Sequence, residues 1–240
     1  MKRINRGAMT PLLFARRSLF AALLATGLAG CSFHTEPPTF TASGYIADQG
    51  INRLWRQDDD QNHPQTLINV YSPYRGKETV VTRYDYQDNH LSQIRETRYV
   101  RNTHDTHDGP DTETVQLRVD PEGNVSFMQR QSASGRVKLS ADDIERYKYQ
   151  ARAVLELSET LRAGQVNLMQ GRWNQGVITA CHGETVKPQF GTYSQIWLAK
   201  RASQANDRLG LAWLSAPEGT ELLLVANEDF CRWEPKAGEL

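Results

Sequence analysis

The chain has 240 residues, of which 39% are hydrophobic and 23% are charged, and its 28 basic residues balance 28 acidic ones. This length suits one domain, or at most two small ones. A chain without an excess of basic residues argues against nucleic acid, whose partners present a stripe of positive charge, so no nucleic-acid partner is predicted.

The first thirty residues have the pattern of an export signal. They contain no acidic residue and five basic ones, namely Lys2, Arg3, Arg6, Arg16 and Arg17. A short apolar stretch, residues 19–28, follows and completes the pattern of a signal peptide. It is too short for a membrane-spanning helix, which needs roughly 20 apolar residues. Met1 and Met9 both precede the Arg16-Arg17 pair, so either fits as the start of translation.

The signal ends in Leu28-Ala29-Gly30-Cys31, which resembles the lipobox of bacterial lipoproteins. In such proteins the cysteine thiol receives a diacylglycerol, the chain is cut before it, and the new amino terminus is acylated. One acyl chain holds a protein to a membrane only reversibly, so stable anchoring takes more than one. By analogy with enterobacterial lipoproteins, Ser32 rather than aspartate directly after the cysteine favours sorting to the outer membrane. We therefore predict a signal peptide over 1–30 and a palmitate-bearing anchor at Cys31; an ordinary secreted protein is the alternative.

The rest of the chain is predicted to lie in the periplasm. Without residues 1–30 it keeps 23 basic and 28 acidic residues, a net charge of about −5. Residues 31–39 are polar, contain Pro37-Pro38, and predict an extended tether. Residues 40–235 are predicted to form a single β-rich domain.

Two cysteines remain once Cys31 carries lipid. Because the periplasm is oxidising, Cys181 and Cys231 are predicted to form a disulfide. Closing a loop of this length restricts the unfolded chain by roughly 4 kcal/mol.

Alternating apolar residues and turn signals predict an antiparallel sheet. Strands are expected over 40–47, 51–55, 67–71, 80–86, 91–100, 115–119, 125–127, 166–169, 177–181, 195–198, 209–214 and 221–225. Pro121 and Gly123 favour the turn between two of them, because proline presets φ and glycine accepts a positive one. Three tryptophans fall within these runs and are predicted to lie in the core: Trp55, Trp197 and Trp213.

One long helix is predicted between residues 140 and 164. Ser140 followed three residues later by Asp143 is typical of a helix start, and Gly164 of a helix end. Apolar residues recur between them at spacings of three and four. The expected fold class is therefore α+β: a mostly antiparallel β-sheet, open or barrel-like, with one long amphipathic helix packed on it.

Three sequence segments, together with the lipobox, resemble the YjaH-like lipoproteins of enteric bacteria. They are PTFTASGYIADQGINRLWR, PEGNVSFMQRQ before SADD, and LAWLSAPEGTELLLV. The resemblance covers the whole mature chain. It implies a lipoprotein with a single domain of unknown function, and it supplies no catalytic residues to transfer.

A histidine-rich segment offers a candidate metal site. His104 and His107, with Asp105, Asp108 or Asp111, have donors that suit Zn²⁺. The same composition is typical of a solvated loop, which is the favoured interpretation. Asp58-Asp59-Asp60 lacks the spacing of a calcium loop and is interpreted as a charged turn.

The sequence contains none of the common catalytic motifs, such as G-x-S-x-G, H-E-x-x-H or a phosphate-binding loop. We therefore expect no enzyme and no cofactor. The favoured function is a non-enzymatic binding or interaction module of the cell envelope, held to the membrane by its lipid, with an envelope protein as the candidate partner. The alternatives are a zinc-binding periplasmic protein and, less favoured, an envelope hydrolase.

Overall fold

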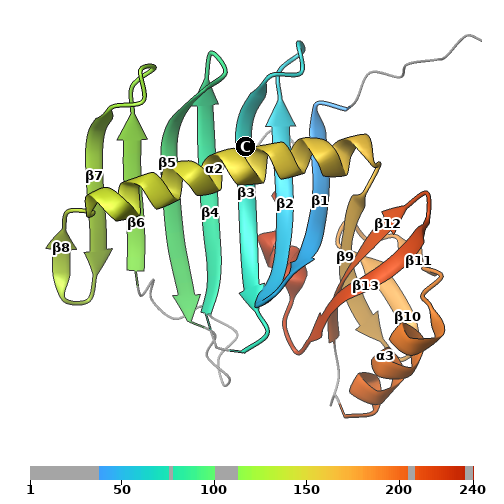
Figure 1. The fold of residues 1–240 in the computed structure, drawn as a ribbon. Helices are drawn as coiled ribbons and strands as arrows, with labels where there is room; N and C mark the ends of the chain where they lie inside the picture. Colours follow the sequence, from blue (N-terminus) through green and yellow to red (C-terminus); the bar gives the residue numbers. More distant parts are fainter. Residues whose placement is uncertain (1–37, 76–77, 101–112, 205–208, 236–239) are drawn as a thin grey trace, which may run out of the picture. The chain divides into compact units, whose positions relative to one another are not determined.

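A computed structural model describes residues 38–75, 78–100, 113–204, 209–235 and 240, which belong to one compact unit, Pro37–Leu240. Its larger sheet has eight antiparallel strands, each paired with the next one along the chain (Figure 1). They are β1 (Phe40–Ala47), β2 (Gly50–Asp58), β3 (Pro64–Pro73), β4 (Glu78–Gln87), β5 (His90–Val100), β6 (Glu113–Val119), β7 (Val125–Ser132) and β8 (Gly135–Val137). Because β1 and β8 are the two edges, this sheet is open rather than closed into a barrel.

A helix of 23 residues, α2 (Ala141–Ala163), crosses one face of this sheet (Figure 1). It begins and ends where the sequence predicts. The Ser140 hydroxyl accepts a hydrogen bond from the Asp143 amide, the Asp143 carboxylate accepts one from the Ser140 amide, and Gly164 caps the other end. Tyr147, Ala151 and Val154 belong to the same buried cluster as side chains of the sheet.

The smaller sheet has five strands in the order β11-β10-β9-β12-β13. Their bounds are β9 (Asn167–Asn174), β10 (Val177–Ala180), β11 (Thr185–Val186), β12 (Leu209–Ala216) and β13 (Gly219–Ala226). Ala212 and Leu223 belong to the same buried cluster as Ile51 and Trp55 of β2, the second in the molecule. Leu209, Leu211 and Trp213 belong to a third cluster, with Leu198 of the helix α3 (Thr192–Gln204) packed against it. Apolar residues on both faces of β12 explain its nearly continuous apolar sequence.

The strand β2 is buried on both sides. Leu54 belongs to the cluster beneath α2, whereas Ile51 and Trp55 belong to the cluster shared with the smaller sheet. Six consecutive residues from Ile51 to Arg56 are therefore buried, including the arginines at 53 and 56. Buried charges need partners, and those partners tie the elements together.

Two sequence predictions, a strand and a buried tryptophan, are wrong for residues 195–198. Residues 195–198 form part of α3 rather than a strand, so the described part of the chain has two α-helices instead of one. Trp197 lies on α3 with 45% of its surface exposed, whereas Trp55 and Trp213 are buried as predicted. A short apolar run such as Ile196-Trp197-Leu198 fits a helix as well as a strand, and Leu198 and Ala202, four residues apart, turn toward the third cluster. Neither described α-helix is long and apolar enough to span a bilayer.

Candidate functional site

Most residues singled out in the sequence as possible sites lie outside the described part of the chain. These are the predicted lipid anchor Cys31 and the histidine segment with His104, Asp105, His107, Asp108 and Asp111. Within the described residues, no group of three or more histidine, cysteine or carboxylate side chains is placed to hold a metal ion. The metal site and the anchor therefore stay predictions.

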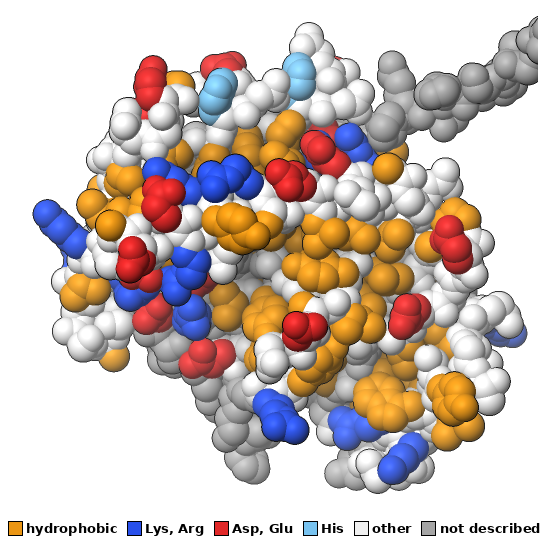
Figure 2. Space-filling model, viewed as in Figure 1, with side chains coloured by type: hydrophobic (Ala, Val, Ile, Leu, Met, Phe, Trp, Pro, Cys, Tyr) orange, Lys and Arg blue, Asp and Glu red, His pale blue; other side chains and the backbone are white. Residues whose placement is uncertain are grey.

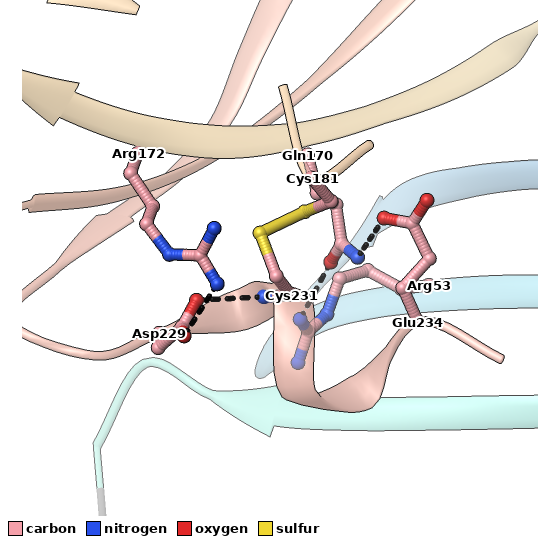
Figure 3. Close-up of a disulfide and its surroundings, with 7 residues drawn as sticks. All are labelled: Arg53, Gln170, Arg172, Cys181, Asp229, Cys231 and Glu234. Carbon is pink, nitrogen blue, oxygen red and sulfur yellow. Dashed lines mark hydrogen bonds and ion pairs between the residues drawn. A yellow bond between two sulfur atoms is a disulfide. The ribbon is translucent and has the colours of Figure 1, made fainter. Parts of the chain in front are cut away.

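The two remaining cysteines are joined (Figure 3). The sulfurs of Cys181 and Cys231 are 2.11 Å apart, and their Cα atoms are 5.2 Å apart. Cys181 directly follows β10, and Cys231 lies in the short helix η1 (Phe230–Trp233). The Asp229 carboxylate accepts a hydrogen bond from the Cys231 amide at 3.1 Å and contacts Arg172 of β9 at 2.7 Å. The C-terminal segment is thereby fastened to the smaller sheet.

Arg53 lies beside this disulfide and is fully buried (Figure 3). Its guanidinium donates hydrogen bonds to Gln170 Oε1 of β9 at 2.8 Å and to Ser72 Oγ of β3 at 3.1 Å. The same group lies 4.9 Å from the centre of the Phe230 ring. Gln170 in turn donates to Glu234 Oε2 at 3.0 Å. This network joins the two sheets and the C-terminal segment, so we assign it to the stability of the fold.

A second buried network corrects the interpretation of Asp58. This residue ends β2 with only 3% of its surface exposed, instead of lying in a charged turn. Its carboxylate accepts hydrogen bonds from Arg56 Nε at 2.6 Å and from Arg162 of α2. Asp59 fits the predicted turn, because its carboxylate accepts from the amides of Gln61 and His63. Asp58 is thus a structural counterion.

A third polar cluster lies between α2 and the sheet. The buried Glu96 carboxylate accepts hydrogen bonds from the Tyr147 hydroxyl at 3.1 Å and from Arg98 at 3.0 Å. Burial, followed by the negative charge of Glu96, raises the pKa of Tyr147 to about 12. Burial also raises the pKa of Tyr84. Both phenols stay protonated, and that of Tyr147 donates to the carboxylate, which again favours a structural role.

The best candidate for a ligand site is a cavity of about 260 Å³ beside α2. It lies between that helix and the ends of two hairpins, β4–β5 and β6–β7. Its apolar wall is formed by Tyr86, Leu91, Val119, Pro121, Ala151 and Leu155. Such a mostly apolar cavity with a few polar groups at its edge is the usual form of a small-molecule site.

Basic side chains lie at the edge of this cavity. Lys148 and Arg152 come from α2, four residues apart on one side of the helix, and His90 comes from the start of β5. Figure 2 shows basic side chains over α2 on this face of the molecule. Arg152 is exposed and forms no ion pair with any residue in the described part of the chain, whereas Lys148 contacts Glu145 at 3.2 Å.

The acidic residue at the edge of the cavity is engaged within its own turn. The Asp120 carboxylate accepts hydrogen bonds from the amide and the side chain of Asn124, at 2.7 and 3.1 Å. These bonds lower the pKa of Asp120, so it remains ionised and directed at the turn. Arg152, which has no ion-pair partner among the described residues, and Lys148 therefore leave the opening able to attract an anion.

Sequence reasoning did not find this cavity. Its walls come from three segments that are separated by about thirty residues each along the chain, around Tyr86, Val119 and Ala151. The one local signal was the placement of Lys148 and Arg152 beside Ala151 and Leu155 on the predicted helix. A second hollow, of about 540 Å³, is lined by polar and aromatic residues such as Asp48, Tyr71 and Tyr74.

Comparisons with known proteins confirm the family resemblance but assign no activity. The chain is 40% identical to the "Uncharacterized protein YjaH" of Escherichia coli (strain K12) over 238 residues, or 98% of each chain. No solved structure matches it. The family model described as "Protein of unknown function (DUF1481)" matches residues 42–236. The chain therefore belongs to the DUF1481 family.

Proposed function

We propose that the protein is an outer-membrane lipoprotein whose periplasmic domain is a non-enzymatic binding module for a small amphipathic anion. The sequence pattern that ends at Cys31 supports the anchor. The cavity beside α2 supports the binding role.

The observation that carries the binding proposal is the pairing of an apolar wall with positive charge at its edge, of which Arg152 has no ion-pair partner among the described residues. Leu91, Val119 and Leu155 offer the surface on which an alkyl or aryl group loses contact with water. Arg152 and Lys148 lie where a carboxylate, sulfonate or phosphate of the same ligand would reach them. A ligand with one anionic group on an apolar body matches both features.

The chemistry of the lining favours binding over covalent catalysis. The described residues around the cavity include no serine, threonine or cysteine. The hydroxyl of Tyr86 donates to the Ala151 carbonyl at 3.4 Å, and burial raises its pKa. His90 Nδ1 lies 2.6 Å from the Asp88 carbonyl, so that nitrogen is engaged. The lining thus supplies groups that hold an anion and no evident nucleophile.

The test uses 1-anilinonaphthalene-8-sulfonate, which combines aromatic rings with one anionic group, and decanoate as a competitor. The protein is the chain from Ser32 to Leu240, since the unit Pro37–Leu240 holds all three buried clusters. We expect saturable fluorescence enhancement that decanoate reverses. Arg152→Glu should lower the affinity for both ligands by about tenfold, because it replaces a charge-assisted contact with repulsion.

The matched control is Lys138→Glu, which makes the same charge change at an exposed site away from the cavity. It should leave both affinities unchanged. Affinities that are equal in the wild type, Arg152→Glu and Lys148→Glu would contradict the assignment of the cavity. An equal loss of affinity in Arg152→Glu, Lys148→Glu and Lys138→Glu would also contradict it, because only the net charge of the protein would then matter.

A further inference from the structure

The helix α3 exposes large hydrophobic side chains to solvent. Tyr193 is 91% exposed, Ile196 62% and Trp197 45%. Because these residues are three and four positions apart, they lie on one face of the helix. Figure 2 shows hydrophobic side chains gathered at this end of the molecule, with basic ones beside them. No residue of α3 is buried.

The hydrophobic core does not account for this face. The side of α3 that meets the smaller sheet uses Leu198 and Ala202, which pack against the third buried cluster. Tyr193, Ile196 and Trp197 therefore lie on the remaining surface, where between 45% and 91% of each residue stays exposed to solvent. A cluster of exposed aromatic and aliphatic residues of this kind marks a contact surface.

The charge around the helix indicates which surface it contacts. Residues 187–204 contain Lys187, Lys200 and Arg201 but neither aspartate nor glutamate. The rest of the chain beyond the predicted signal is acidic overall. Lys200 lies four residues after Ile196, so a basic group borders the hydrophobic face. A local basic segment of this kind complements an anionic surface.

We propose that the outer face of α3 binds the surface of an anionic phospholipid bilayer. Tryptophan and tyrosine are the residues that favour the headgroup level, and lysine and arginine add attraction to anionic lipids. The nine residues 31–39 reach at most about 30 Å, so a lipid on Cys31 would hold the domain as a whole, though not α3 in particular, near the membrane. This tethering depends on the proposed lipid anchor, whereas the proposed binding by the outer face of α3 does not.

The test measures binding of the unlipidated chain, Ser32 to Leu240, to vesicles of phosphatidylcholine with or without phosphatidylglycerol. We expect flotation with the anionic vesicles, a blue shift of tryptophan fluorescence, and weaker binding at high salt. Ile196→Ser combined with Trp197→Ser should reduce binding by at least about tenfold, since it removes the inserted apolar surface. Lys200→Glu should also reduce it.

The matched control is Tyr149→Ser on α2, a residue that is 65% exposed and lies away from α3. It should bind the vesicles like the wild type. Tyr193→Ser replaces a side chain that is 91% exposed, so it supplies a variant that folds even if the double variant does not. Arg152→Glu should also bind normally, which separates this proposal from that of the ligand cavity.

Two results would overturn the proposal. One is equal binding to neutral and anionic vesicles by the wild type and the α3 variants. The other is absence of vesicle binding together with a concentration-dependent dimer that the α3 variants abolish, since the face would then bind a second copy of the chain.

Discussion

The carboxylate of Asp58, at the end of β2, accepts a hydrogen bond from Arg162 in the last turn of α2, 104 residues further along the chain. The same carboxylate binds Arg56 at 2.6 Å, and the side chains of Asp58 and Arg56 are 1% and 3% exposed. Arg56 also donates to Ser158 Oγ of α2 at 3.1 Å. One buried acid thus links the end of β2, the second strand of the large sheet, to the C-terminal end of the helix that crosses it.

We predict that Asp58→Ala destabilises the protein by about 3–5 kcal/mol, because it leaves the guanidinium of Arg56 buried without its main counterion. Arg162→Met should cost less, since Arg56 still neutralises Asp58 and the Arg162 side chain is partly exposed. Urea unfolding of the chain from Ser32 measures both free energies. A smaller loss for Asp58→Ala than for Arg162→Met would contradict the role of Asp58 as a shared counterion.

The disulfide between Cys181 and Cys231 closes a loop with a sequence separation of 50 residues. Replacing both cysteines by alanine should lower the free energy of unfolding by about 4 kcal/mol, because the unfolded chain regains that loop entropy. The measurement is urea unfolding with and without reductant. Reductant should destabilise the wild type and leave the double variant unaffected. Thiol labelling of the unreduced protein at either cysteine would contradict the prediction.

Local signals predicted those parts of the fold that depend on neighbouring residues. The bounds of α2 follow from Ser140, Asp143 and Gly164, all of which act within one turn of the helix ends. The strand β1 follows from alternation and a turn signal, and it spans the predicted residues 40–47. In these segments the tertiary structure adds nothing that contradicts the local preference.

The features that depend on distant partners could not be predicted. Asp58 looks like part of an acidic turn until Arg162 is placed beside it. The apolar run in α3 fits either a helix or a strand, and only Leu198 against the smaller sheet decides between them. The cavity beside α2 exists because two hairpin ends meet one helix, so no single segment of sequence carries its signature.

The proposed anchor makes a separate prediction about Cys31. Cys31→Ser should abolish incorporation of labelled palmitate, because the thiol is the site of lipid attachment. The protein should then leave the detergent-rich phase in detergent partitioning, or accumulate with its signal uncleaved. Cys181→Ala is the matched control, since it removes a cysteine that is not predicted to carry lipid. Unchanged palmitate labelling in Cys31→Ser would contradict the anchor.

The raised pKa values of the buried tyrosines predict that stability falls in alkali. The unfolded chain loses its phenolic protons near pH 10, whereas burial and Glu96 hold Tyr147 protonated to about 12. Since the folded state then binds more protons, the free energy of unfolding decreases as the pH rises from about 10 to 12. Below pH 10 both states keep these protons, so the contribution is constant there.

Tyr147→Phe tests this explanation. The variant loses the hydrogen bond to Glu96, so it should be less stable than the wild type at pH 8 by about 1 kcal/mol or more. The decline of its free energy of unfolding between pH 10 and 12 should nevertheless be shallower, because one titrating phenol is absent. Tyr84 and Tyr86, whose pKa values burial also raises, account for the rest of the decline. Tyr149→Phe, at a position 65% exposed, should reproduce the wild-type slope. An identical slope in Tyr147→Phe and the wild type would show that the phenol beside Glu96 does not titrate differently in the folded and unfolded states.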